Sequence, residues 1–302
     1  MVVAPRSFLV TLALGATLIA APAAHAVVWG LKSLAPSTGA ASSAPTALFS
    51  FNEDGTGLAT SGNVTVAGVA VDADGLAISQ TNNLFAYALS PNGSQLLSLD
   101  SGTAVGTAIG SALSGREIRG AAFDTSGQLF ALDALNDDVL LIDTTTGAVL
   151  SVISLAVAGF DIATGADLAF RADGTAVLVE GGAFYLLNLA TSSVTPLFTE
   201  TVIEVGTATP FYAGIAFSAN AALDDLFAYE VNSTDDIYLY PAIDSGFSRS
   251  LLIGNVVSAF NSGRGDLAAV VVGQSVPEPA TLSLLGLGLA GLGAVRRKKL
   301  AA

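Results

Sequence analysis

The unit that decides the fold lies between residues 120 and 142. It comprises Gly120-Ala-Ala-Phe123, a polar turn at Asp124-Thr-Ser-Gly127, and two apolar runs, Leu129-Phe-Ala-Leu132 and Val139-Leu-Leu-Ile142. Short aliphatic and aromatic runs separated by Gly, Asp and Asn are typical of β-strands joined by turns. The unit therefore predicts consecutive strands of one small antiparallel sheet.

Related openings recur along the chain at intervals of 47 to 52 residues. Most are followed by a polar turn and further apolar runs, so that each unit accommodates about four strands. A period near 50 residues with four short strands is the pattern of a β-propeller blade. We predict an all-β, β-propeller-like fold of about five four-stranded blades, with an open sandwich or a different number of blades as the alternatives. The openings are Gly68-Val-Ala-Val71, Gly120-Ala-Ala-Phe123, Asp167-Leu-Ala-Phe170, Gly214-Ile-Ala-Phe217 and Asp266-Leu-Ala-Ala269.

The last unit has an inner strand at Asp266 to Val272 but no room for more strands before the C-terminal tail. The segment Thr46-Ala-Leu-Phe-Ser-Phe51 resembles the outer strands of other units. We therefore expect the N-terminal strands to close the ring, which removes exposed sheet edges. This gives a β-propeller-like domain at 46–273, and the pattern resembles quinoprotein-like and lactonase-like propeller sequences in general without a motif that fixes one family.

The segment before this domain, 27–45, is rich in Ser, Ala, Thr, Pro and Gly and shows no hydrophobic period. It reads as a flexible leader, with Trp29 and Lys32 outside the fold. Within the domain, aromatic residues fall at strand positions repeated between units, so we expect them to pack between blades: Phe85, Tyr87, Phe130, Phe227 and Tyr229.

Residues 1–26 carry the pattern of a secretory signal peptide. Arg6 precedes an apolar core from Phe8 to Ala21, and Ala24-His25-Ala26 is a small-x-small cleavage site. Signal peptidase would cleave after Ala26. A retained N-terminal membrane helix is the alternative interpretation.

That cleavage limits the chemistry of the mature chain. His25 is the only histidine and the chain has no cysteine. A mature chain without either residue lacks histidine-ligated metals, a Ser-His-Asp triad and a cysteine nucleophile. Residues 27–275 hold 24 acidic and six cationic residues, a formal charge of −18. A surface this acidic repels nucleic acid and anionic lipid, so no nucleic-acid partner is expected.

The C-terminal segment 274–302 has three parts in a fixed order. Pro277, Glu278 and Pro279 interrupt any helix, because proline cannot donate a backbone hydrogen bond. An uncharged run at 280–295, predicted to be a single membrane helix, is slightly shorter than the roughly 20 residues that span a bilayer comfortably. The run ends in a basic stop that would remain cytoplasmic: Arg296, Arg297, Lys298 and Lys299.

This order closely resembles the PEP-CTERM sorting tail of exported bacterial proteins, with the motif at 276–279. The resemblance implies transient anchoring in the inner membrane, processing near the motif by an exosortase-type peptidase, and release to the cell surface or the extracellular space. It also implies bacteria that make exopolysaccharide. A permanent membrane anchor is the alternative.

Acidic residues provide the candidate sites within the domain. Asp72 and Asp74 in Asp72-x-Asp74-Gly75, and the segment Asn52-Glu53-Asp54-Gly55, offer closely spaced oxygen ligands of the kind used in calcium loops. Plain turns are the alternative, since Asp and Gly favour turns. We also expect solvated turns at the acidic pairs 137–138, 224–225 and 235–236.

Asp167 and Asp266, which open two inner strands, are candidate acids for glycoside hydrolysis. Arg119 and Arg264 lie nearby in the repeat register, so the alternative that we favour is that these charges pair across the channel or cap strand ends. The sequence thus predicts an exported, non-catalytic binding or scaffold module associated with exopolysaccharide or biofilm, without a cofactor. A secreted hydrolase of lactonase or glycosidase type, dependent on carboxylates or calcium, is the second hypothesis.

Overall fold

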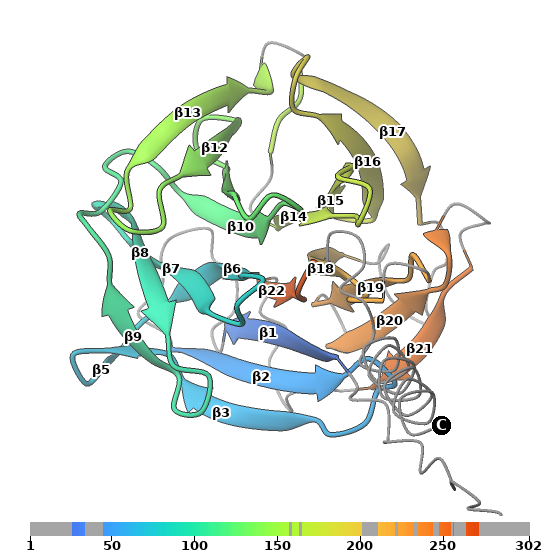
Figure 1. Cartoon of the computed structure of the whole chain (residues 1–302), viewed down its shortest axis with the longest axis horizontal. Helices are drawn as coiled ribbons and strands as arrows, with labels where there is room; N and C mark the ends of the chain where they lie inside the picture. The colour runs from blue at the N-terminus through green and yellow to red at the C-terminus, as the bar shows by residue number, and fades with distance from the viewer. Residues whose placement is uncertain are drawn as a thin grey trace, which may run out of the picture.

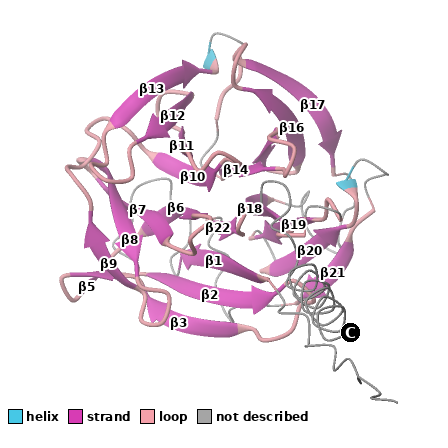
Figure 2. Cartoon of the chain, viewed as in Figure 1, coloured by secondary structure: helices cyan, strands magenta, loops and turns pink. Residues whose placement is uncertain are grey.

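The computed structural model describes residues 26–33, 45–156, 159–162, 165–200, 211–220, 223–231, 235–243, 248–254, 256 and 264–271. Five sheets are arranged around a central axis as the blades of a β-propeller (Figure 1). Strands and their connecting turns make up almost all of the described chain (Figure 2). The predicted all-β, five-bladed fold is confirmed.

Three blades are four-stranded antiparallel meanders in chain order. The first comprises β10 (Ile118–Phe123), β11 (Leu129–Asp133), β12 (Asp138–Ile142) and β13 (Val149–Ser154). The next comprises β14 (Ala166–Phe170), β15 (Ala176–Glu180), β16 (Ala183–Asn188) and β17 (Ser193–Thr199). The third comprises β18 (Tyr212–Phe217), β19 (Leu226–Glu230), β20 (Asp236–Tyr240) and β21 (Ser250–Ile253).

A fourth blade carries two extra strands at its outer edge. Its meander is β6 (Ala73–Ile78), β7 (Leu84–Ser90), β8 (Gly93–Leu99) and β9 (Val105–Ala108). The short hairpin of β4 (Thr65–Val66) and β5 (Val69–Ala70) pairs with β9 in parallel. This hairpin covers the exposed edge of the blade, which is one way of blocking unwanted strand pairing.

The fifth blade joins the two ends of the described chain. Its order is β22 (Gly265–Ala268), β1 (Val27–Ser33), β2 (Thr46–Asn52) and β3 (Ala59–Asn63). Strand β1 lies between the C-terminal β22 and β2, antiparallel to both, with Leu31 opposite Asp266 on one side and Leu48 on the other. Closure by N-terminal strands is therefore confirmed, and it uses one strand more than the sequence indicated.

The flexible-leader interpretation is wrong for residues 27–33, because they form β1 with its side chains largely buried. The pattern was missed because the partners of β1 are set by distant parts of the chain rather than by local periodicity. Residues 34–44, the signal segment 1–25 and the tail beyond 271 lie outside the described residues.

The opening proposed for the first unit is also wrong. Gly68-Val-Ala-Val71 lies in the exposed β4–β5 hairpin, and the inner strand of that blade is β6, which contains Gly75-Leu-Ala-Ile78. The segment Asp72-Ala-Asp-Gly75 is consequently the start of a buried inner strand and not a polar turn.

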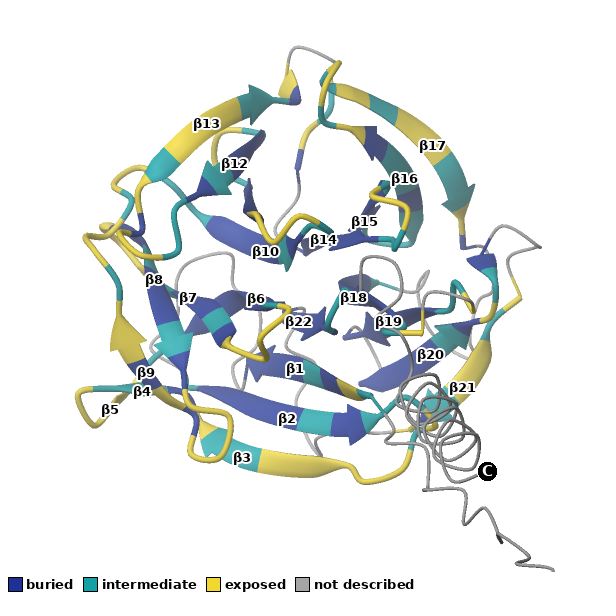
Figure 3. Cartoon of the chain, viewed as in Figure 1, coloured by how far each residue is buried: buried dark blue, intermediate teal, exposed yellow. Residues whose placement is uncertain are grey.

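The hydrophobic cores lie between adjacent blades, and exposed residues concentrate on the outer strands (Figure 3). Aromatic rings meet across these interfaces: Phe51 and Phe227 in an edge-to-face contact at 6.0 Å between centroids, and Phe130 and Phe170 in a tilted contact at 5.3 Å. The expectation that the repeated aromatic positions pack between blades is confirmed. Such pairs add about 0.5–1.5 kcal/mol each beyond their buried area.

Candidate functional site

The inner strands approach closely at the axis, and one position of each inner strand holds either glycine or an aspartate that accepts a hydrogen bond from the neighbouring blade. The same strand position holds Gly75, Gly120, Asp167, Gly214 and Asp266. A Cβ atom on Gly120 would lie 2.6 Å from Asp167 Oδ1, and one on Gly214 would lie 2.7 Å from the carbonyl carbon of Asp266. Gly120 thus leaves room for the carboxyl group and backbone of Asp167, and Gly214 leaves room for the backbone of Asp266.

Asp167 and Asp266 each reach from one blade to the next. Asp167 Oδ2 accepts a hydrogen bond from the Ile215 N–H at 2.6 Å, which links β14 to β18. Asp266 Oδ2 accepts one from the Leu76 N–H, which links β22 to β6. Both side chains are fully buried. The two candidate acids thus hold neighbouring inner strands together.

The carboxyl groups of Asp167 and Asp266 also interact with each other. Burial raises the pKa of both well above the ordinary value of 3.8, and the charge of Asp167 raises the pKa of Asp266 further. Two buried carboxyl groups in contact cannot both ionise cheaply, so the pair holds a proton. This arrangement explains how a second acid is tolerated at the axis.

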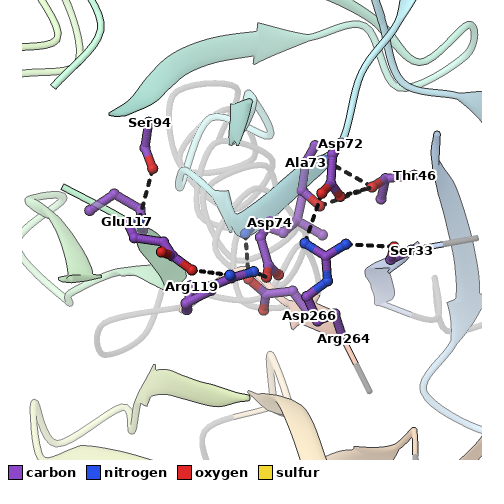
Figure 4. Close-up of polar contacts among 12 residues, drawn as sticks. Ser33, Thr46, Asp72, Ala73, Asp74, Ser94, Glu117, Arg119, Arg264 and Asp266 are labelled. Carbon is purple, nitrogen blue, oxygen red and sulfur yellow. Dashed lines mark hydrogen bonds and ion pairs between the residues drawn. The ribbon is translucent and has the colours of Figure 1, made fainter. Parts of the chain in front are cut away.

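Arg264 ties the closing blade to its neighbour. Its Nη1 donates to Asp72 Oδ2 at 2.8 Å and its Nη2 to Ser33 Oγ at 3.1 Å (Figure 4). The Thr46 hydroxyl binds the other oxygen of Asp72 at 3.3 Å. These contacts join the end of β1, the start of β2 and the start of β6, so they reinforce closure of the ring.

Arg119 forms the second ion pair of the cluster. Its Nη1 lies 3.4 Å from Asp74 Oδ2, and its Nη2 donates to Glu117 (Figure 4). Burial raises the pKa of Asp74 to about 7, despite the opposing charges of Arg119 and Arg264. The contact with Arg119 is long, which is why desolvation prevails. Asp74 Oδ1 and Arg119 Nε are buried without a hydrogen-bond partner.

We call this group the central cluster. It comprises Asp72, Asp74, Arg119, Asp167, Arg264 and Asp266. The two arginines form ion pairs that link β6 to the start of β22, through Asp72 and Arg264, and to β10, through Asp74 and Arg119. The two candidate acids instead accept backbone N–H groups of neighbouring blades. The favoured prediction of pairing across the channel therefore describes the arginines and not Asp167 and Asp266.

The two residues predicted as calcium ligands do not form an open oxygen loop. Asp72 and Asp74 are each 3% exposed, and an arginine occupies the space beside each carboxylate. Among the described residues no group of three acidic or histidine side chains is arranged to hold a metal. At Asn52-Glu53-Asp54-Gly55 the Asp54 carboxylate caps its own turn and Glu53 binds Ser218 and Ala219. Calcium binding by this protein stays a prediction.

The acidic pairs lie only partly in turns, because Asp138 and Asp236 are the first residues of β12 and β20. Several members are also buried. Asp137, Asp224 and Asp235 have φ values of 53° to 55°, the left-handed region that Asp tolerates in turns. Asp224, however, forms an ion pair with Arg171, and Asp235 forms one with Lys32. The solvated interpretation is therefore wrong for Asp235, and also for Asp138 and Asp236, which are each 8% exposed, whereas the side chain of Asp224 stays 27% exposed.

The Lys32–Asp235 pair is the contact that sequence reasoning missed. Lys32 lies in β1 and is fully buried, and Asp235 lies just before β20 of the next blade. A lysine assigned to a leader gives no reason to look for a partner across the ring. The repeat itself could have indicated β1, because the blade that begins at Asp266 needs three further strands and only the N-terminal segment can supply them.

The remaining predicted sites lie at the ends of the chain. Ala26 is the residue immediately before β1, whereas Ala24 and the tail residues of the sorting motif and basic stop lie outside the described residues. Among the described residues no helix is long and apolar enough to cross a membrane.

Comparison with known families identifies the tail. Residues 275–298 match the family model described as the PEP-CTERM protein-sorting motif. This motif implies export, transient membrane anchoring through the C-terminal tail, and processing by an exosortase. No curated protein matches the sequence. The molecule is thus a five-bladed propeller joined to a PEP-CTERM sorting tail.

Solved propeller structures share only distant similarity with the chain. A streptogramin B lyase structure has a TM-score of 0.39 at 10% identity, over 74% of this chain and 65% of the lyase. A Bacteroides caccae protein of unknown function has a TM-score of 0.47 at 10% identity, over 81% of this chain and 98% of that protein. TolB from Acinetobacter baumannii has a TM-score of 0.47 at 11% identity, over 81% of this chain and 66% of TolB. The chain thus spans about two thirds of the lyase and of TolB, and likenesses this distant carry no argument about activity.

Proposed function

We propose that this protein is an exported surface protein whose propeller is a non-catalytic module that binds exopolysaccharide. The observation that carries the proposal is the PEP-CTERM motif at 275–298, which implies export and temporary anchoring. A protein delivered in this way meets the polymers that surround the cell, so a binding role for its one large domain follows naturally.

The central cluster supports a structural rather than a catalytic role for the axial acids. Asp167 and Asp266 are fully buried, and their oxygens accept backbone N–H groups of neighbouring blades. A general acid must come within hydrogen-bond reach of the substrate atom that it protonates. Groups that hold the inner strands together at the axis are poorly placed for that task.

The charge of the chain supports a neutral ligand. Residues 27–275 have a formal charge of −18, which repels polyanions at moderate ionic strength. A neutral polysaccharide carries no such penalty. Nucleic acid and strongly acidic glycans are therefore disfavoured as partners.

A secreted hydrolase is the second candidate, because Asp74 has a pKa near neutrality. Carboxyl groups with raised pKa values serve as general acids in glycosidases. The arrangement needs a path from solvent to Asp74, which is 3% exposed. This burial makes hydrolysis the less favoured proposal.

The test is binding of the purified full chain, in a sugar-free detergent, to exopolysaccharide from the producing strain. We expect saturable co-sedimentation that is unchanged by calcium or by a chelator, with no reducing ends released. Release of reducing ends that is lost in Asp74→Asn would favour the hydrolase instead. Loss of binding in chelator would establish calcium as a cofactor, and absence of binding in every condition would refute recognition of this polymer.

A further inference from the structure

A small pocket lies between two blades, beside the central cluster. It has a volume of about 160 Å³. One wall is the end of β7 and its turn into β8, and the other is the segment Gly115–Arg119 that leads into β10, with Leu135 at the rim. The pocket is well below the roughly 300–1,000 Å³ of sites for drug-sized ligands, so its occupant is a small molecule or one unit of a polymer.

Arg116 and Glu117 bring unused hydrogen-bonding groups to this pocket. Arg116 Nη1 donates to Asp133 at 2.8 Å and to Asp138 at 2.9 Å, and no other described residue accepts from its Nε or Nη2. Glu117 Oε1 accepts from Arg119, which leaves Oε2 available. The side chains of Arg116 and Glu117 are 24% and 34% exposed, so a ligand can reach both.

The local charges select against an anion. Arg116 lies between the carboxylates of Asp133 and Asp138, and Arg119 contacts both Asp74 and Glu117. Arg116 is thus offset by two carboxylates and Arg119 by that of Glu117, so no positive excess remains even when Asp74 is protonated. A donor beside an acceptor suits neighbouring hydroxyl groups, which both donate and accept.

Apolar side chains complete the pocket. Leu89 and Leu135 line it, and Leu135 is 60% exposed. A pyranose ring presents hydroxyl groups at its edge and C–H groups on its faces, so it matches a pocket with both kinds of lining. The size, charge balance and polarity of the pocket are therefore all consistent with a neutral sugar.

We propose that this pocket binds a single neutral sugar unit, with Arg116 donating to and Glu117 accepting from neighbouring hydroxyl groups. The inference rests on the proposed glycan-binding function and assigns that function to one site. It places recognition between two blades and beside the axis, where the central cluster fixes the position of Arg119 and hence of Glu117.

The experiment is a ligand-observed NMR titration of the full chain with D-glucose, D-galactose and D-mannose, with D-glucuronate as the anionic comparison. We expect at least one neutral hexose to bind saturably and more tightly than glucuronate. Glu117→Gln removes the charged acceptor, and Leu135→Trp covers the rim from an exposed position. Each is expected to weaken hexose binding at least tenfold. Leu223→Trp is the matched control, since Leu223 is 48% exposed and does not line the pocket, and it is expected to bind as the wild type does.

Thermal unfolding of each variant establishes that it is folded, and the exposed position of Leu135 keeps the test valid even if Glu117→Gln fails to fold. Wild-type affinity in a folded Leu135→Trp variant would overturn this site. So would the absence of hexose binding, or tighter binding of glucuronate. If the wild type binds exopolysaccharide in those cases, the proposed function survives and only its location is wrong. Hexose binding in the pocket without any polysaccharide binding would retain the site and refute the broader function.

Discussion

Deletion of residues 27–33 is expected to abolish the folded propeller. The deletion removes β1 from between β22 and β2, so the closing sheet loses its connection across the ring. Two fully buried apolar side chains, Val28 and Leu31, are lost with it. Burial of such side chains stabilises a fold by about 1.5–3 kcal/mol each.

The same deletion breaks the buried pair of Lys32 with Asp235 and leaves the carboxylate without its ammonium partner. Removing one member of a buried ion pair costs about 3–5 kcal/mol. The combined loss is comparable with the entire stability of a typical domain, about 5–15 kcal/mol. We therefore expect no cooperative thermal transition in the deleted protein and rapid digestion by protease.

A synthetic peptide of residues 27–33 provides the control. Added in excess, it is expected to restore part of the β-sheet circular dichroism signal, because it supplies the missing strand. A deleted protein that melts cooperatively within a few degrees of the wild type would show that β1 does not close the ring. The result also bears on export: cleavage after Ala26 leaves β1 whole, whereas cleavage inside 27–33 would damage the propeller.

The second large effect is a loss of stability as the pH rises from about 4 to about 7. Burial raises the pKa of Asp74 from 3.8 to about 7 in the folded protein, so between these values the folded state holds a proton that the unfolded state has lost. The resulting stabilisation is fully present below about pH 3.8 and disappears as the pH passes through 7. The free energy of unfolding falls by about 1.4 kcal/mol per pH unit in this range, which amounts to a loss on the order of 4 kcal/mol in total.

Few other titratable groups are expected to oppose this fall in stability with pH. The only histidine, His25, precedes the described residues, so the side chain that usually titrates near neutrality is missing from them. Asp167 and Asp266, also with raised pKa values, add to the effect in the same direction. The exposed turn residues Asp100 and Asp143 have lowered pKa values, so their contributions change only at pH values below 3.8.

Urea unfolding at several pH values measures the slope directly. Asp74→Asn imitates the protonated side chain, so we expect its stability at pH 8 to approach that of the wild type at pH 5, with a flatter profile between them. Asp173→Asn, a change in the exposed turn between β14 and β15, is the matched control and is expected to keep the wild-type slope. A wild-type protein whose stability is constant or increases from pH 5 to pH 8 would contradict the buried, protonated state of Asp74.

Much of the fold could be predicted from the repeat alone. The openings at Gly120, Asp167, Gly214 and Asp266 all mark inner strands, because a buried strand beside the axis needs a small or bonded residue followed by apolar ones. The prediction of the first inner strand was wrong because Gly68-Val-Ala-Val71, which lies in a hairpin, matches the same pattern by chance. A short pattern of common residues cannot exclude such coincidences.

The candidate site was only partly predictable for a physical reason. Spacing in the sequence predicted that Asp167 and Asp266 open inner strands, with Arg119 and Arg264 nearby, and the structure places all four at the starts of inner strands beside the axis. It could not show that Asp72 and Asp74 begin a strand, since Asp and Gly favour turns wherever packing does not override them. Nor could it pair Lys32 with Asp235, because that contact depends on closure of the whole ring.

The most direct test of the whole account is the destination of the protein in its own cells. An epitope inserted in the exposed turn at residues 100–103, between β8 and β9, reports that destination without touching the tail. We expect antibody to reach the wild-type epitope on intact cells or in the medium, on a chain shortened at its C-terminus. The double variant Pro277→Ala/Pro279→Ala is expected to stay in the inner membrane at its unprocessed size, and Pro196→Ala in the propeller to behave as the wild type. Equal surface delivery of the double variant, or a wild-type chain that never leaves the inner membrane, would contradict the account.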